Sequence, residues 1–275
     1  MRSTSPGERP RGVTILANPY SGARDNPARI GALAGAMRAE GLDPFPIWSL
    51  DELFSAAAEP DFAATQRAVV AAGGDGTFNC LINRPIPVPL AMYPLGNENL
   101  LARQFGYTSD PQWMARMIAA GKTQAIDLGR AGERRFGIVA SAGFDGDTAH
   151  RLARWRERAG RLKRVRSLNY LRPIVESACL YRYPMLEIEA DGQQICGALA
   201  MVFNLPQYAN SLPLAPDALA DDGLLDWLVF ARPGSVPLMR YALQVWTGRH
   251  RGCDGVYFGR AKRIQINCQT PAPME

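Results

Sequence analysis

Residues 73–79, Gly-Gly-Asp-Gly-Thr-Phe-Asn, decide how the first half of this chain folds. The apolar run 68–72 stands directly before them and is typical of a buried strand, and an apolar pattern that favours a helix resumes at 80–82. A strand, a glycine turn and a helix start together hold a phosphate, because glycine permits close approach and the helix start presents free N–H groups. Asp75 would repel a phosphate, so its expected partner is a divalent cation. A glycine turn that binds nothing is the alternative interpretation.

Strands and helices alternate on both sides of this turn. We predict strands at 13–17, 45–50, 69–72 and 89–93, and helices starting at Asn26, Asp51, Asn97 and Pro111. Such alternation indicates a parallel sheet with helices on both faces. Ligands bind such sheets beyond the carboxyl ends of the strands, so the loops 18–22, 73–79 and 96–99 are expected at one edge.

The second half has a different pattern. Residues 184–190 alternate between apolar and polar, and Asp191-Gly192 is a strong hairpin signal. Further strands are predicted at 195–203, 224–230 and 263–268, with a helix at 236–246. The fold class is therefore α/β: an N-terminal parallel-sheet nucleotide-binding domain, residues 1–125, followed by an antiparallel β-rich domain, residues 126–275.

Composition limits the class of protein. The formal charge of +5 favours anionic partners. Five cysteines without C-x-x-C spacing are typical of reduced cytosolic thiols, and two histidines exclude a histidine-rich metal centre. The polar N-terminus does not resemble a signal peptide, and no uncharged apolar run approaches the roughly 20 residues of a membrane helix. We expect a cytoplasmic protein.

Six motifs, in order, resemble the diacylglycerol kinase catalytic domain family, in the bacterial lipid-kinase branch related to sphingosine and ceramide kinases. They lie at 18–22, 73–79, 94–99, 126–129, 142–145 and 215–226. The resemblance implies an N-terminal fold like that of NAD kinases and diacylglycerol kinases, and a C-terminal domain that binds the lipid. NAD kinases share the glycine turn, but the segment 215–226 fits lipid kinases better.

The resemblance implies transfer of phosphate from ATP to a hydroxyl of diacylglycerol or a similar lipid, with Mg²⁺. The residues expected to bind ATP are Asn18, Ser21, Gly73, Gly74, Asp75, Gly76, Thr77, Asn79 and Asn97, the last in place of a threonine. Asp75 and Asp127 are the expected catalytic carboxylates that organise Mg²⁺, and the third acid of the diacylglycerol kinase branch is Leu100 here.

A separate structural Mg²⁺ is implied at Asp222, with the main-chain carbonyls of Leu219 and Leu224. A simple turn before the next strand is the alternative interpretation of the same residues.

The family's general base lies in a D-G-E motif of the last strand, and the printed sequence holds no such motif. Asp254-Gly255-Val256 is the only nearby D-G-x and lacks the glutamate. Either the sequence is truncated, or the acid is supplied otherwise, or the protein is inactive, and we therefore assign no general base. A catalytically impaired relative that binds nucleotide or lipid is the alternative function.

Basic residues gather between Arg151 and Arg166 at roughly helical spacing with apolar ones. Arg154, Arg158 and Arg161 are expected to contact an anionic membrane surface, so that the protein binds peripherally at the inner face. A solvated helix face without a partner is the alternative, and nucleic acid is not expected because no DNA-binding motif accompanies the charge. The sequence leaves a homodimer open.

Overall fold

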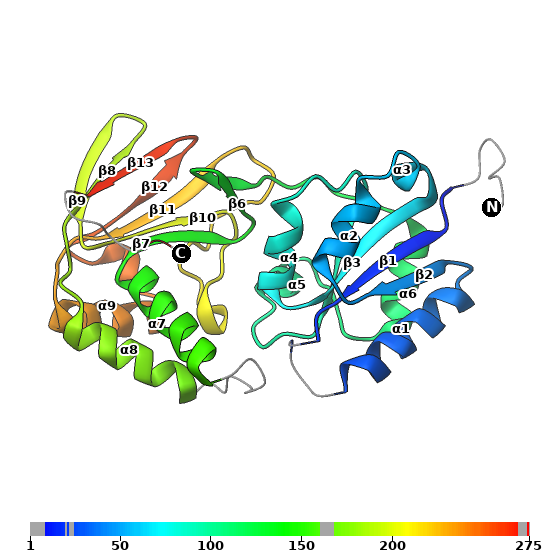
Figure 1. The fold of residues 1–275 in the computed structure, drawn as a ribbon. Helices are drawn as coiled ribbons and strands as arrows, with labels where there is room; N and C mark the ends of the chain where they lie inside the picture. Colours follow the sequence, from blue (N-terminus) through cyan, green and yellow to red (C-terminus); the bar gives the residue numbers. More distant parts are fainter. Residues whose placement is uncertain (1–8, 20, 22–24, 160–167, 269–273, 275) are drawn as a thin grey trace. The chain divides into compact units, whose positions relative to one another are not determined.

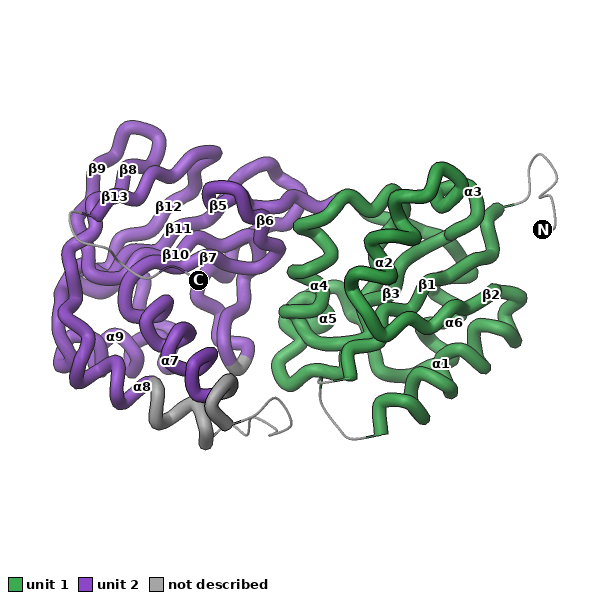
Figure 2. The backbone as a smooth tube through the Cα atoms, viewed as in Figure 1, with its two compact units in different colours: residues 1–125 green, residues 126–275 purple. Residues whose placement is uncertain are grey.

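A computed structural model describes residues 9–19, 21, 25–159, 168–268 and 274. The chain divides into two compact units, residues 1–125 and 126–275, shown in different colours in Figure 2. Each unit is described here by itself.

The first unit holds a four-stranded parallel sheet in the order β2-β1-β3-β4 (Figure 1). Its strands are β1 (Gly12–Ala17), β2 (Asp43–Ile47), β3 (Gln66–Gly73) and β4 (Leu90–Pro94). Its helices are α1 (Asn26–Ala39), α2 (Leu50–Ala57), α3 (Phe62–Thr65), α4 (Asp75–Ile82), α5 (Leu100–Gln104) and α6 (Pro111–Ala120). The predicted alternation and parallel sheet are therefore confirmed.

A single apolar core holds α1 and α6 against one face of this sheet. Leu33 and Met37 of α1 and Met114 of α6 are fully buried against strand residues such as Val70. These helix residues recur at helical spacing, so each helix turns one apolar stripe toward the strands. Packing of α1 and α6 covers this face of the sheet, and the loops that follow the strands lie at the edge of the sheet.

Two predicted boundaries in this unit were wrong. The strand predicted at 45–50 ends at Ile47, because the Ser49 side chain accepts the N–H of Glu52 and starts α2. The helix predicted from Asn97 begins at Leu100, after Asn99 in the left-handed region with φ of 52°.

The second unit is built from antiparallel strands, as predicted. One sheet has the order β12-β11-β10-β7 and the other β13-β8-β9, with a small β5-β6 hairpin beside them. The strands are β5 (Gly129–Ala131), β6 (Arg134–Phe136), β7 (Val139–Gly143), β8 (Leu186–Ala190), β9 (Gln193–Gly197), β10 (Leu199–Phe203), β11 (Leu225–Phe230), β12 (Val256–Ala261) and β13 (Ile264–Cys268).

Helices cover the face of the β12-β11-β10-β7 sheet that the second sheet leaves free (Figure 1). They are α7 (Phe144–Ala159), α8 (Leu168–Leu180) and α9 (Ser235–Trp246), with short 3₁₀ turns at Ala209–Ser211 and His250–Gly252. Alternation along β11 separates two cores: Trp227 and Val229 face the second sheet, whereas Leu228 and Phe230 face the helices.

The strand predicted at 195–203 is in fact two strands in different sheets. β9 pairs with β8, and β10 pairs with β7 and β11. Gly197 lies at the crossing, where an added Cβ would collide with the side chain of Val229, and the next residue, Ala198, donates its N–H to the carbonyl of Phe230 at 2.9 Å. Only glycine permits this close passage from one sheet to the other.

Within the described part of the chain, none of the helices combines the length and the apolar character needed to cross a bilayer.

Candidate active site

The glycine turn joins β3 to α4, as the sequence predicts. β3 ends at Gly73, Gly74 occupies the N-cap position, and α4 begins at Asp75. An added Cβ on Gly73 would collide with the Thr77 side chain, and one on Gly96 would lie 2.6 Å from the Cα atom of Gly74. The turn is therefore too tight at these positions for any other residue.

The loops that follow β1, β3 and β4 meet at the carboxyl edge of the sheet. Asn18 Nδ2 donates to Thr77 Oγ1 at 3.0 Å, and the N–H of Leu95 donates to the carbonyl of Gly73 at 2.9 Å. These loops lie close together because the carboxyl ends of adjacent parallel strands share one edge of the sheet. The structure thus brings Asn18, Gly73, Gly74 and Thr77 together.

Three other residues predicted to bind ATP lie around this edge. The Ser21 N–H donates to the carbonyl of Asn18 at 3.3 Å, which places Ser21 in the loop after β1. Asn79 is exposed on α4, and Asn97 is exposed in the loop between β4 and α5.

Asn26 also lies at this edge, although the sequence indicates only that a helix starts there. Asp25 occupies the N-cap position of α1, and Asn26 is the first helical residue. The Asn26 side chain is 3% exposed, and its Nδ2 donates to the carbonyls of Ser21 at 2.5 Å and Asn18 at 3.1 Å. Asn26 therefore holds the loop after β1 in place. The sequence offers only the pair Asn26-Pro27 at a helix start, and the burial of Asn26 appears only in the structure.

Asp75 has a structural partner that the sequence did not reveal. Its two carboxylate oxygens accept the N–H groups of Leu100 and Leu101 at 3.0 and 3.1 Å, so the side chain caps the start of α5. Burial raises the pKa of Asp75, although these two hydrogen bonds oppose the rise. Each oxygen keeps a second lone pair, so the carboxylate can still approach a cation.

The start of α4 is open to a ligand. Gly76 is exposed, and no heavy atom lies within 4 Å of the position that its Cβ would take. The N–H of Thr77 already donates to the Gly74 carbonyl at 2.9 Å, but the helical residues before Thr77 have no carbonyl partner for their N–H groups inside the helix, and the helix dipole adds partial positive charge there. This end of α4 therefore offers an anion-binding position beside the Asp75 carboxylate.

Asp127 lies in the second unit, at the base of the loop that precedes β11. Its N–H donates to the carbonyl of Ala220 at 2.6 Å, and its Oδ2 accepts the N–H of Gly223 at 2.7 Å. The fully buried Asn204 donates from Nδ2 to the carbonyl of Asp127 at 2.9 Å. The 126–129 motif is thereby tied to the 215–226 motif, nearly a hundred residues away in sequence.

The residues expected to hold a structural Mg²⁺ lie in that same loop. Asp222 Oδ1 accepts the N–H of Leu224 at 3.0 Å, which closes a turn, and Leu219 is exposed. Arg260, which the sequence analysis did not single out, lies 3.7 Å from Asp222 Oδ2 and 3.5 Å from Asp226 Oδ1. A guanidinium therefore already supplies positive charge at this turn. Across the described residues, no three His, Cys, Asp or Glu side chains gather in a way that would hold a metal ion.

A cavity of about 720 Å³ opens between the two sheets of the second unit. Apolar side chains that line it include Phe136, Ala140, Val202, Ile264 and Ile266. Asp127, Arg130, Lys262 and Arg263 also line it. The cavity therefore combines apolar side chains with charged groups, which suits a molecule with a polar head and an apolar tail.

Asp145, in the 142–145 motif, is held by two hydroxyl groups. Ser141 Oγ donates to Asp145 Oδ2 at 2.6 Å, and the Tyr208 hydroxyl donates to Oδ1 at 2.5 Å. Burial raises the pKa of Asp145, and these two hydrogen bonds oppose the rise. Tyr208 comes from a distant loop, so no local pattern indicated this cluster.

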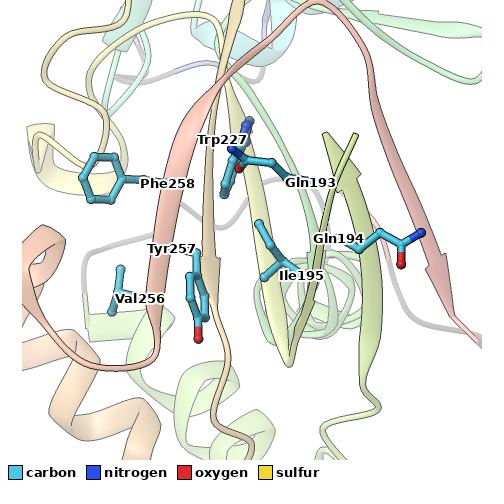
Figure 3. Close-up of a pocket in the computed structure, with 7 residues that line it drawn as sticks. All are labelled: Gln193, Gln194, Ile195, Trp227, Val256, Tyr257 and Phe258. Carbon is cyan, nitrogen blue, oxygen red and sulfur yellow. The ribbon is translucent and has the colours of Figure 1, made fainter. Parts of the chain in front are cut away.

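A second cavity, of about 510 Å³, lies between β9 and β12, which are edge strands of their sheets (Figure 3). Gln193, Gln194, Ile195, Trp227, Val256, Tyr257 and Phe258 line it. The indole N–H of Trp227 is buried and has no hydrogen-bond partner among the described residues. This cavity offers one unpaired donor, and nothing else in its lining specifies a ligand.

The basic residues predicted to contact a membrane are only partly described. Arg154 is exposed on α7. Arg158 lies within the same helix, but its side chain is outside the described part, and Arg161 lies outside the described residues. Arg151, at the start of the basic stretch, pairs with Asp147 at 2.6 Å, so its charge is already neutralised.

Two family models match the chain. One, described as the diacylglycerol kinase catalytic domain, matches residues 12–131, and the other, described as the YegS C-terminal NAD kinase beta sandwich-like domain, matches residues 138–275. The Mycobacterium tuberculosis (strain ATCC 25618 / H37Rv) diacylglycerol kinase is 30% identical over 93% of this chain and 85% of its own length. The Bacillus subtilis (strain 168) diacylglycerol kinase is 27% identical over 72% of this chain and 66% of its own.

Solved structures share the fold. A crystal structure of a diacylglycerol kinase from Bacillus anthracis str. Sterne superposes with a TM-score of 0.65 at 19% identity, over 96% of this chain and 89% of that one. Another structure from the same organism reaches a TM-score of 0.70 at 20% identity, over 96% and 94% of the two chains.

Proposed function

Because this chain belongs to the diacylglycerol kinase family, a family of lipid kinases, we propose that it transfers the γ-phosphoryl group of ATP to a hydroxyl of diacylglycerol or a similar lipid. The observation that carries the proposal is the tight glycine turn at the open start of α4, next to a buried carboxylate. A polyphosphate needs main-chain donors at short range, and this turn supplies them without a side chain in the way.

The nucleotide would bind along the carboxyl edge of the first unit. Gly73, Gly74, Gly76 and Thr77 form the turn that receives the phosphates. Asn18 and Ser21, together with the exposed Asn79 and Asn97, border the same edge and supply amide and hydroxyl groups. The Asn18–Thr77 hydrogen bond fixes two of these side chains before ligand arrives, which lowers the entropy cost of binding.

Mg²⁺ fits Asp75 by the chemistry of its donors. Mg²⁺ in phosphoryl-transfer sites is bound by one or two carboxylates and by the substrate phosphates, so a cluster of three acids is not required. When bound, Mg²⁺ neutralises charge on the transferring phosphoryl group. Asp75 would hold it in the first unit. Asp127, which belongs to the second unit, is proposed separately as a catalytic carboxylate. We extend the proposal to a structural Mg²⁺ at Leu219, Asp222 and Leu224, where Arg260 is the competing cation.

The lipid would occupy the 720 Å³ cavity of the second unit. Acyl carbons would contact Phe136, Val202 and Ile266, because these side chains exclude water, while the polar head stays near Asp127 and Lys262. The proposed partners are this lipid and an anionic membrane surface at the inner face, which the protein would bind peripherally with Arg154, Arg158 and Arg161.

The transfer step forms a bond between the lipid hydroxyl oxygen and the γ-phosphorus, and breaks the bond from that phosphorus to the β–γ bridging oxygen. ADP leaves, and the hydroxyl proton must pass to a base. Such a base contributes about 10²–10⁴-fold in rate, and no residue of this chain is assigned to the role. The alternative function, a catalytically impaired relative that still binds nucleotide or lipid, follows from this gap.

Thin-layer analysis of lipids incubated with radiolabelled ATP, Mg²⁺ and the purified full chain tests the proposal. Labelled phosphatidic acid from diacylglycerol vesicles is the expected product. Calorimetric heat with MgATP but no labelled lipid from any lipid extract would establish the impaired relative instead. No heat and no label would overturn the nucleotide site as well.

A further inference from the structure

α9 carries an apolar stripe on its outer face. Val236, Met239, Leu243 and Trp246 are 73%, 63%, 58% and 75% exposed. Their spacing of three and four residues places them on one side of the helix. Four large apolar side chains in a row on a surface helix are unusual, because such residues are normally scattered singly over a surface.

The opposite face of α9 already attaches the helix to its unit. Tyr241 and Val245 are buried against the β12-β11-β10-β7 sheet, and the ring centroids of Tyr241 and Phe230 lie 4.8 Å apart. The Tyr241 hydroxyl also accepts the N–H of Arg232 at 3.2 Å. The stripe is therefore not needed to hold α9 in place.

Only cations accompany the stripe along the chain. Residues 235–253 contain Arg240, Arg249 and Arg251 but no Asp or Glu. Arg251 pairs with Asp217, whereas Arg240 and Arg249 are exposed. An apolar stripe with one exposed arginine on the same helix, Arg240, and another shortly after its end, Arg249, is complementary to a surface that presents anionic groups above hydrocarbon.

The size of the stripe does not suit a stable protein partner. Four side chains on a helix of 12 residues cover less than the roughly 800 Å² per partner that specific interfaces bury. α9 lies beside α8 in Figure 1, and Ser235 Oγ at the start of α9 donates to the carbonyl of Ala178 near the end of α8. This contact places the exposed Leu180, the last residue of α8, near α9. Trp246 has the amphipathic ring that favours the headgroup level of a bilayer.

We propose that α9 is a membrane-docking helix, which inserts Val236, Met239, Leu243 and Trp246 into the boundary between headgroups and acyl chains of an anionic bilayer. Arg240 and Arg249 meet the lipid phosphates. This proposal rests on the proposed function, because a diacylglycerol substrate resides in a bilayer and the enzyme must bind the bilayer to reach it. It adds a surface distinct from the basic stretch of α7.

Sedimentation with phosphatidylcholine vesicles, with and without phosphatidylglycerol, tests the helix in the full-length protein. The test variant is Leu243→Gln with Trp246→Gln, both exposed, so that the fold is kept. The matched control is Phe45→Gln with Trp48→Gln, which are 52% and 42% exposed in the other unit. We expect the test variant to need about tenfold more anionic lipid, or more, for half-maximal pelleting, because it loses apolar area from the bilayer. The control is expected to pellet like the wild type.

Tryptophan fluorescence gives an independent readout. Vesicles should shift the wild-type emission to the blue, and the shift should disappear in Trp246→Phe but persist in Trp48→Phe. Wild-type pelleting of the α9 variant overturns the proposal. A second result would also overturn the proposal. If analytical ultracentrifugation shows a wild-type dimer, and the α9 variant is monomeric but binds vesicles like the wild type, then a second copy of the chain covers the stripe.

Turnover of a dispersed short-chain diacylglycerol separates this proposal from the proposed function. We expect the α9 variant to match the wild type on that substrate and to fall behind on vesicles. If the wild type phosphorylates neither substrate, the proposed function fails, and the sedimentation result still decides whether α9 docks.

Discussion

Gly96 approaches Gly74 so closely that a Cβ built on Gly96 would lie 2.6 Å from the Cα atom of Gly74. Asn99 reinforces the contact, because its Oδ1 accepts the N–H of Gly96 at 3.0 Å and its Nδ2 donates to the Gly96 carbonyl at 2.9 Å. These contacts hold the loop after β4 against the glycine turn after β3. Two glycine-bearing motifs that are separate in the sequence form one surface.

Gly96→Ala should disturb this surface and the fold together. The added methyl group must displace main chain, so we expect a loss of about 1–3 kcal/mol in the free energy of unfolding and weaker MgATP binding. Urea denaturation and calorimetry measure the two effects. Gly31→Ala is the control, because no atom lies near its Cβ position within α1, and alanine there should stabilise by about 0.5–1 kcal/mol. Unchanged stability and binding in Gly96→Ala would contradict the geometry.

Asp75→Asn separates the cap of α5 from the proposed metal ligand. The amide oxygen can still accept one of the two hydrogen bonds from the start of α5, so the fold should remain with a weakened cap, but the amide lacks the charge that attracts Mg²⁺. We expect kcat/KM for lipid phosphorylation to fall about 10²-fold or more. Asp51→Asn, at an exposed position of α2, should retain wild-type activity. If both variants keep full activity, Asp75 does not serve the metal.

Arg260→Gln tests whether Arg260 neutralises the carboxylates of Asp222 and Asp226 at the start of β11. Asp226 is 4% exposed, and burial raises its pKa while Arg260 lowers it. Removing the Arg260 guanidinium leaves the carboxylate with only the weaker influence of Arg251. We expect a loss of about 1–2 kcal/mol in the free energy of unfolding, toward the low end because Arg260 is half-exposed. Chemical denaturation measures the loss, with the exposed Arg116→Gln as control.

The same variant addresses the proposed structural Mg²⁺. If a cation and Arg260 compete for Asp222, then Mg²⁺ should raise the melting temperature of Arg260→Gln more than that of the wild type. Equal shifts in the two proteins would show that Arg260 and the metal do not share a position.

Asp145→Asn should change how stability depends on pH. Burial raises the pKa of Asp145 in the folded state, so the folded protein holds this proton more tightly than the unfolded chain does. The stability from this group is therefore present at low pH and is lost as the pH rises through the folded-state pKa. We expect the unfolding free energy of the variant, relative to the wild type, to increase as the pH rises above about 4, the ordinary pKa of an aspartate.

Tyr208→Phe provides the complementary measurement. Its hydroxyl lowers the pKa of Asp145, so without it the wild-type decline in stability should extend to higher pH. A pH profile of denaturant midpoints for the three proteins is the readout. Parallel profiles would show that Asp145 does not titrate differently on folding.

Local patterns were enough to predict the architecture of both units. β3, the glycine turn and α4 follow one another in sequence, so the apolar run and the glycines specify them without distant partners. The hairpin between β8 and β9 is equally local, because Asp191 and Gly192 both adopt the positive φ that its turn requires.

Contacts between residues far apart in the sequence could not be predicted from local patterns. The run 195–203 is apolar or small throughout and predicts a single strand, and only the position of Val229 beside Gly197 shows why it divides between two sheets. Arg260 pairs with Asp222 and Asp226 across strand pairing that no sequence pattern encodes.

Spacing and residue type act over a few neighbours, so they were sufficient to predict the order of the elements, the glycine turn after β3 and the family resemblance. The Asp75 cap on α5 and the exposed position of the α9 stripe became visible only once the chain was folded. Both outcomes depend on which surfaces meet after folding, and periodicity alone does not say whether the apolar side of a helix faces a sheet or the solvent.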